Sequence, residues 1–155
     1  MANEAGGQGQ FGAQRLVLVC ENASERQAVI RAAIEQLGYT MLPAGTAEEA
    51  SERLRRHAFE IVIVDERFES SGVLDNVVLK ILNTMPIGAR RHVFVVLLGR
   101  EFKTFDNMMA FARSVNVVVN LNDLPHLPAI IRKGLEDNDE FYRVFKEMLT
   151  EVGKR

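Results

Sequence analysis

The feature of the sequence that most constrains the fold is a set of short runs, each with a continuous apolar stretch of at least three residues. They are RLVLV (15–19), FEIVIVD (59–65), HVFVVLLG (92–99) and VNVVVNL (115–121). A strand with one wet face alternates apolar and polar residues, whereas continuous runs of this length are typical of strands buried on both faces of a parallel sheet. The stretch YTMLPA (39–44) predicts one further strand, the second in chain order, and Pro43 favours an edge position because proline has no N–H to donate.

Helical patterns separate these runs. Asn22 and Thr46, each followed three residues later by a glutamate, predict two capped helix starts, and Thr104 predicts a third. The first of these helices should end at Gly38, since glycine is favoured just past a helix C terminus. Five strands alternating with five helices indicate an α/β fold with helices on both faces of a parallel sheet. We therefore expect a doubly wound, five-stranded, flavodoxin-like (βα)5 domain with an extra C-terminal helix.

Composition excludes several other classes of protein. The 155 residues suffice for one ordinary domain, and a net charge of −2 gives no general attraction to nucleic acid or anionic membranes. No apolar run approaches the roughly 20 residues that span a bilayer. The single cysteine, Cys20, excludes an internal disulfide and suits a reducing compartment. We therefore expect a cytoplasmic protein with no nucleic-acid or membrane partner.

Three of the predicted strands end in polar residues, and a fourth ends in a leucine. Cys20 and Glu21 follow the first strand, Asp65 ends the third, Leu98 ends the fourth and Asn120 ends the fifth. In open parallel sheets, binding sites form beyond the carboxyl ends of the strands. We expect Glu21 and Asp65 to meet there. Because neighbouring carboxylates repel each other, the pKa of one of them should rise.

The order and spacing of these strand ends resemble the receiver domain of bacterial two-component response regulators, over roughly Arg15 to Leu135. CE in LVLVCEN matches the acidic pair of the family, and Asp65 in IVIVDERF matches its phosphoacceptor aspartate. The resemblance implies a signalling module that is not an enzyme. It also implies a Mg²⁺ ion held by Glu21, by Asp65 and by the backbone carbonyl of Arg67.

The departures from the family pattern lie in the same site. Cys20 replaces an acid and, as a soft ligand, suits Mg²⁺ poorly. The hydroxyl residue of the family falls at Leu98, its lysine at Asn120 and its switch aromatic at Val117. Forming an aspartyl phosphate depends on electrostatic positioning by such groups. We therefore predict a vestigial pocket of Cys20, Glu21, Leu98 and Asn120, and a degenerate receiver (pseudo-receiver) without a cofactor that acts by phosphorylation-independent protein–protein interaction.

Two alternatives remain open at this stage. One is a working phosphoacceptor, phosphorylated on Asp65 with Mg²⁺ held by Glu21 and Asp65. The other is a redox or small-molecule sensor built on the modified pocket around Cys20. A reactive thiol needs a positive neighbourhood, and two nearby carboxylates argue instead for a buried, unreactive cysteine.

The resemblance also implies a face for a protein partner or for self-association. It consists of the fourth helix, the fifth strand and the fifth helix, here roughly Thr104 to Leu135. Met108, Met109 and Phe111 are the residues of interest. Helical periodicity cannot bury all three, so at least one should face outward.

The chain is predicted to divide into a flexible segment 1–14, a receiver-like domain 15–137 and an amphipathic helical extension 138–155. Asn138 or Asp139 is expected to cap a separate helix of about fourteen residues, too short to be stable alone. Its apolar residues are spaced 4, 3 and 4 apart: Phe141, Phe145, Met148 and Val152. This stripe either packs back on the domain or serves as a dimerisation or docking helix.

Overall fold

The computed structural model describes residues 15–70 and 75–153, so the predicted flexible segment 1–14 lies outside the described residues. Within them, five strands form one parallel sheet in the order β3-β2-β4-β5-β6. The strands are β2 (Leu16–Cys20), β3 (Thr40–Pro43), β4 (Ile61–Asp65), β5 (Phe94–Gly99) and β6 (Val117–Asn120). The doubly wound, flavodoxin-like prediction is confirmed, and Pro43 lies in an edge strand as expected.

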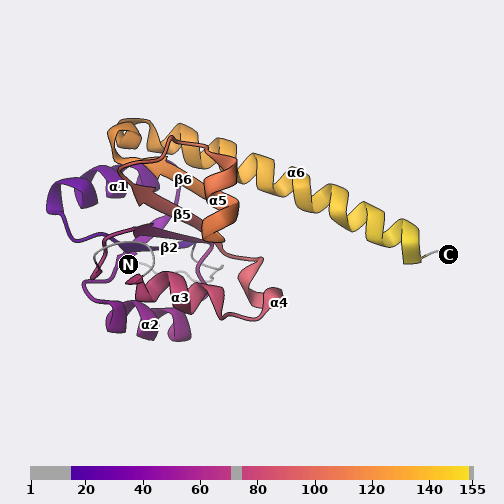
Figure 1. The fold of residues 1–155 in the computed structure, drawn as a ribbon, viewed down its shortest axis with the longest axis horizontal. Helices are drawn as coiled ribbons and strands as arrows, with labels where there is room; N and C mark the ends of the chain where they lie inside the picture. Colours follow the sequence, from indigo (N-terminus) through magenta and orange to yellow (C-terminus); the bar gives the residue numbers. More distant parts are fainter. Residues whose placement is uncertain (1–14, 71–74, 154–155) are drawn as a thin grey trace, which may run out of the picture.

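Helices cover both faces of the sheet. They are α1 (Ser24–Gln36), α2 (Ala47–Arg56), α3 (Val77–Asn83), α4 (Ile87–Arg90), α5 (Asn107–Arg113) and α6 (Leu127–Gly153), with a 3₁₀ turn η2 (Leu121–His126) before α6. Figure 1 shows α2 and α3 on one side of the sheet, and α1 and α6 on the other. None of the helices in the described part of the chain is long and apolar enough to span a membrane.

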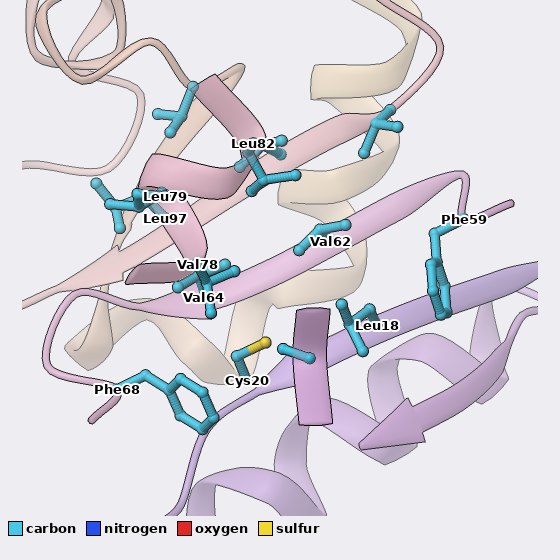
Figure 2. Packing of buried hydrophobic residues seen from close by; sticks show 14 of the residues in the cluster. Leu18, Cys20, Phe59, Val62, Val64, Phe68, Val78, Leu79, Leu82 and Leu97 are labelled. Atoms are coloured by element: carbon cyan, nitrogen blue, oxygen red, sulfur yellow. The ribbon is translucent and has the colours of Figure 1, made fainter. Parts of the chain in front are cut away.

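The core consists of two layers, because successive strand residues point to opposite faces of the sheet. In the α1/α6 layer, strand residues such as Val17 and Ile63 pack against Ile30 of α1 and Ile131 of α6. The α2/α3 layer lies on the opposite face. Figure 2 shows this second layer, with strand residues packed against α3; the labelled side chains include Leu18, Cys20, Val62, Val64, Val78, Leu79 and Leu82.

The predicted helix caps have mixed outcomes. Thr46 caps α2, with its hydroxyl oxygen accepting from the N–H of Glu49 at 3.0 Å. The Asn22 prediction is wrong, because Ala23 is the N-cap residue of α1 and its N–H donates to the Glu21 carboxylate. The Thr104 prediction is also wrong. Asp106 caps α5, while the Thr104 hydroxyl accepts from the N–H of Asn120.

The C-terminal helix is one continuous element of 27 residues. Asn138 and Asp139 lie inside it, so the separate capped helix predicted at 138 is not present. Its first part packs closely on the sheet, since a Cβ atom at Gly134 would lie 2.7 Å from the Cζ atom of Phe94. Its second part extends away from the rest of the domain (Figure 1).

Candidate functional site

Two buried carboxylates meet at the carboxyl edge of the sheet, as the sequence predicts. The parallel register pairs Cys20 with Val64, so Glu21 and Asp65 follow at adjacent strand ends. Their exposed fractions are 1% and 3%. Arg26 of α1 joins them, because its Nη2 atom lies 3.2 Å from Oε2 of Glu21 and 3.5 Å from Oδ2 of Asp65. The pair therefore lies beneath a shared guanidinium group.

A second guanidinium group binds Asp65 directly. Arg100 donates from Nη1 to Oδ1 at 2.8 Å and from Nη2 to Oδ2 at 3.1 Å. This two-bond geometry is the strongest form of arginine–carboxylate pairing. The backbone N–H of Arg67 also donates to Oδ1, at 2.9 Å. Both oxygens of the Asp65 side chain are thus engaged by the protein itself.

The turn that carries Arg100 is held in place by its neighbours. The N–H of Arg100 donates to the Glu66 carboxylate at 3.0 Å. Gly99 permits this close approach, since a Cβ atom there would lie 2.4 Å from the Phe102 ring and 3.0 Å from the Glu66 carboxyl carbon. The Asn120 amide donates to the carbonyl of Phe102 at 2.8 Å and to that of Arg100 at 3.3 Å. Arg100 is therefore positioned by several elements.

The pKa values of the two carboxyl groups are shifted in opposite directions. Burial raises the pKa of Glu21 above its ordinary value, and hydrogen bonds from Arg26 and from the N–H of Ala23 offset this only in part. Burial would also raise the pKa of Asp65, but hydrogen bonds from Arg100 and from the N–H of Arg67 outweigh it and hold that pKa below its ordinary value. The expected rise of one pKa is confirmed at Glu21, with burial as its largest cause.

Two other residues of the predicted pocket, Leu98 and Asn120, have structural roles. Leu98 pairs in register with Asp65 and is fully buried in the α1/α6 layer, as is most of Val117. Asn120 uses its amide to pin the Arg100 turn rather than to reach Asp65. The sequence pattern brings Glu21, Asp65 and Leu98 together as expected, while the side chain that binds both oxygens of Asp65 is that of Arg100, two positions after Leu98.

Cys20 points into the α2/α3 layer and is fully buried (Figure 2). Burial raises the pKa of its thiol to about 12. A thiol in this state is neither a nucleophile nor a metal ligand at neutral pH. The surroundings of Cys20 therefore give no support to a redox sensor at this position.

We expect the Cys20 thiol to react with a disulfide reagent such as Ellman's reagent only when the domain opens. Labelling of the native protein should be slow, and it should become rapid once urea unfolds the chain, because the thiolate form is scarce and the sulfur is inaccessible. The absorbance of the released thiolate measures both rates. Equally fast labelling with and without urea would contradict this burial.

The residues predicted for a partner face lie on α5. Met108 and Phe111 are exposed, with exposed fractions of 79% and 85%. Met109 turns inward and packs against the α2/α3 layer. The outward orientation of at least one of the three is confirmed, and two of them are available at the surface of this chain.

The predicted Mg²⁺ ligands do not fit that ion in this arrangement. Both Asp65 oxygens accept from guanidinium groups, the Glu21 carboxylate accepts from Arg26, and the Arg67 carbonyl accepts from the N–H of Ser70. Two guanidinium groups therefore occupy the carboxylate oxygens that would coordinate a divalent cation. In the described ranges, no cluster of three or more histidine, cysteine, aspartate or glutamate side chains is arranged to hold a metal ion.

Sequence reasoning missed three residues of this site. Arg26 and Arg100 lie 39 and 35 residues from Asp65 along the chain, so no local pattern joins them to it. Asn76 is fully buried and donates from Nδ2 to the carbonyls of Asp65 and Glu66, both at 3.1 Å. The available signal for the arginines was only their position, each shortly after a strand end.

Comparison with known proteins supports the fold. No protein-family model matches the chain, and no curated protein is similar to it in sequence. Among solved structures it is similar to a response regulator from Thermotoga maritima, at 17% identity and a TM-score of 0.61 over 80% of this chain and 99% of that chain. It is also similar to a response regulator receiver protein from Pseudomonas putida, at 19% identity and a TM-score of 0.59 over 79% of this chain and 99% of that chain. A Francisella response regulator receiver domain is similar at 15% identity and a TM-score of 0.62, over 80% of this chain and 98% of that chain. The chain therefore has the fold of response-regulator receiver domains.

Proposed function

We propose that this chain is a receiver-like signalling module that binds a protein partner without phosphorylation of Asp65, and that it is not an enzyme. The observation that carries the proposal is the paired hydrogen bond from Arg100 to both oxygens of Asp65. The receiver fold supplies the scaffold. Because Arg100 occupies both oxygens of Asp65, this aspartate is not available for phosphorylation.

The physical argument concerns what a phosphoryl group needs. Its transfer to a carboxylate requires a free oxygen as nucleophile and cations placed around the equatorial oxygens in the transition state. In this chain Arg100 covers the nucleophile and lowers its pKa, which also lowers its nucleophilicity. The positions of the helper hydroxyl and ammonium are taken by buried Leu98 and by Asn120, which is bound to backbone carbonyls.

The proposed partner surface is the outward side of α5. Met108 and Phe111 are large apolar side chains at the surface, and side chains of this kind are enriched in the centres of protein interfaces. Met109 contributes from beneath by fixing α5 against the α2/α3 layer. In this proposal α5 receives a different protein, whose apolar patch covers Met108 and Phe111.

One observation favours the working phosphoacceptor as a second candidate. Glu21 and Asp65 lie close enough to share Arg26, so the two carboxylates remain side by side at the carboxyl edge of the sheet. In that candidate the ion is held by Glu21, Asp65 and the carbonyl of Arg67. This candidate requires that Arg100 first release Asp65. Ligand binding at Asp65 therefore distinguishes the two candidate functions.

A thermal melt with millimolar Mg²⁺ and beryllofluoride, which mimics an aspartyl phosphate, tests the proposal. We expect the same Tm with and without these additions, because no oxygen of Asp65 is free to bind them. The Asp65→Asn variant is the control for non-specific ion effects. A rise of several degrees that Asp65→Asn abolishes would establish the phosphoacceptor instead, as would an Asp65-dependent phosphoryl adduct in the intact mass after acetyl phosphate treatment.

A further inference from the structure

We propose that the second half of α6 is a self-association surface, which pairs antiparallel with α6 of a second copy of this chain. This goes beyond the proposed function, because it concerns a different face and a different partner. Self-association through α6 would hold whether or not Asp65 is ever phosphorylated.

The surface is a row of apolar side chains with no cover in the described chain. We call it the α6 stripe; its members are 42–64% exposed and comprise Phe141, Val144, Phe145, Met148, Leu149 and Val152. The opposite side of the helix is polar, with Arg143 bonded to both Glu140 and Glu147. Contiguous apolar patches of this kind mark interaction sites in proteins that are otherwise well packed.

The helix itself points to a missing neighbour. Figure 1 shows the second half of α6 extending away from the body of the domain. Isolated helical segments of this length are only marginally stable in water. Most helical stability in proteins comes from packing an amphipathic face, and here that face is exposed. A neighbouring helix would provide the packing.

The spacing of the stripe fits a second copy of itself. Phe141, Phe145, Met148 and Val152 follow the 4-3-4 spacing of the seam between two paired helices. The spacing is the same when it is read backwards. An antiparallel two-fold pair therefore places Phe141 against the partner's Val152 and Phe145 against the partner's Met148. Such a self-complementary contact closes at two copies and leaves no surface for further growth.

Charge favours the antiparallel direction over the parallel one. Four carboxylates gather at the start of the segment, at Glu136, Asp137, Asp139 and Glu140. Residues 143–153 carry two basic and two acidic side chains and so have no net charge. A parallel pair would place the four carboxylates beside the same four of the partner, whereas an antiparallel pair keeps the two acidic clusters at opposite ends of the contact. Like charges placed side by side disfavour an interface.

A groove next to the stripe offers room for the end of the second helix. It has a volume of about 460 Å³ and lies between α6 and the body of the domain. Its apolar lining includes Phe94, Leu135, Tyr142 and Leu149. In the antiparallel pair, the end of the partner's α6 lies alongside residues 138–142, beside this groove. The groove and the stripe then form one continuous contact surface.

Light scattering after size exclusion tests the proposal on the full chain. We expect the mass of two 17.4 kDa chains for the wild type and of one chain for the double variant Phe141→Glu/Met148→Glu. Circular dichroism should show that the variant keeps its folded core, since both side chains are exposed. The matched control is Ile87→Glu, which places the same charge on exposed α4 and should leave the dimer intact. A monomeric wild type, or a dimer that persists in the double variant, would overturn the proposal.

Engineered cysteines test the direction of pairing. We expect a disulfide-linked dimer when Phe141→Cys and Val152→Cys proteins are mixed under oxidation, and little from either protein alone. The native Cys20 is buried and does not interfere. Cross-linking of each variant with itself would show a parallel pair and overturn the antiparallel arrangement. A mixture that yields no cross-link would overturn the proposed seam.

Discussion

Replacing Arg100 with alanine is expected to lower the free energy of unfolding by about 3 kcal/mol, because removing one partner of a buried ion pair leaves the Asp65 carboxylate with only the longer, 3.5 Å ion pair to Arg26. Asp65 is 3% exposed and loses two of its hydrogen bonds in this variant. Glu66 also loses a contact with the guanidinium group. For a domain of ordinary stability, about 5–15 kcal/mol, this is a large fraction of the total.

Urea denaturation measures this loss. The matched control is Arg55→Ala, which removes an exposed arginine that is paired with Glu52 and should change stability by at most about 0.5 kcal/mol. A double-mutant cycle with Asp65→Asn isolates the pairwise contribution. If Arg100→Ala costs no more than the Arg55→Ala control, Arg100 is not the counter-ion of Asp65.

The same variant should alter the pH dependence of stability. The pKa of folded Asp65 is below its ordinary value of 3.8, so the ionised carboxylate stabilises the fold above that value and this contribution is lost as pH falls through the folded pKa. The raised pKa of Glu21 acts in the opposite direction, but it is present in both proteins. The difference between wild type and Arg100→Ala should therefore be largest near neutral pH and shrink mainly as pH falls through 3.8 toward the folded pKa of Asp65.

Replacing Asn76 with alanine should cost about 3 kcal/mol, the second of the large effects. Nδ2 of Asn76 donates to the carbonyls of Asp65 and Glu66, and its Oδ1 atom accepts from the N–H of Leu79 at the start of α3. Alanine loses all three bonds, although the Asp65 carbonyl still accepts from the N–H of Phe68 and the Glu66 carbonyl from the Ser70 hydroxyl. Each lost bond costs about 1 kcal/mol, so the three together account for the expected loss.

Two further variants separate the roles of Asn76. Thr46→Ala removes a helix cap and nothing more, and should cost about 1 kcal/mol. Asn76→Asp keeps the capping oxygen but replaces the amide donor with a buried carboxylate beside two carbonyl oxygens, so we expect a loss at least as large as that of Asn76→Ala. Urea denaturation again gives the values. An aspartate variant as stable as the wild type would show that the contacts to the two carbonyls contribute nothing.

The sheet could be predicted from sequence because its information is local. Continuous apolar runs identify buried parallel strands, and Pro43 identifies the edge strand. The helix ends were less predictable, since a capping residue competes with other uses of the same side chain. Thr104 has the chemistry of a cap but bonds to Asn120, and Asp139 resembles a helix start although the apolar periodicity of α6 continues through it.

The site was predictable in its carboxylates and not in its cations. Glu21 and Asp65 follow directly from where two neighbouring strands end. The contact of Arg100 with Asp65 depends on a turn that is shaped by Gly99 and pinned by Asn120, and such long-range geometry leaves no periodic pattern in a sequence. Family resemblance directed attention to Leu98 and Asn120, whereas the compensating charge lies between them in the chain.

The absence of a side chain at Gly134 has a mechanical consequence. α6 is about 40 Å long at 1.5 Å per residue, and it rests on the Phe94 ring near its first quarter. That contact divides α6 into a short segment inside the domain and a long segment that carries the stripe. A small tilt of the helix at Gly134 would therefore displace Val152 several times farther than it displaces the start of the helix. The position of the stripe relative to the sheet therefore depends on the close approach to Phe94 that the missing Cβ atom of Gly134 permits.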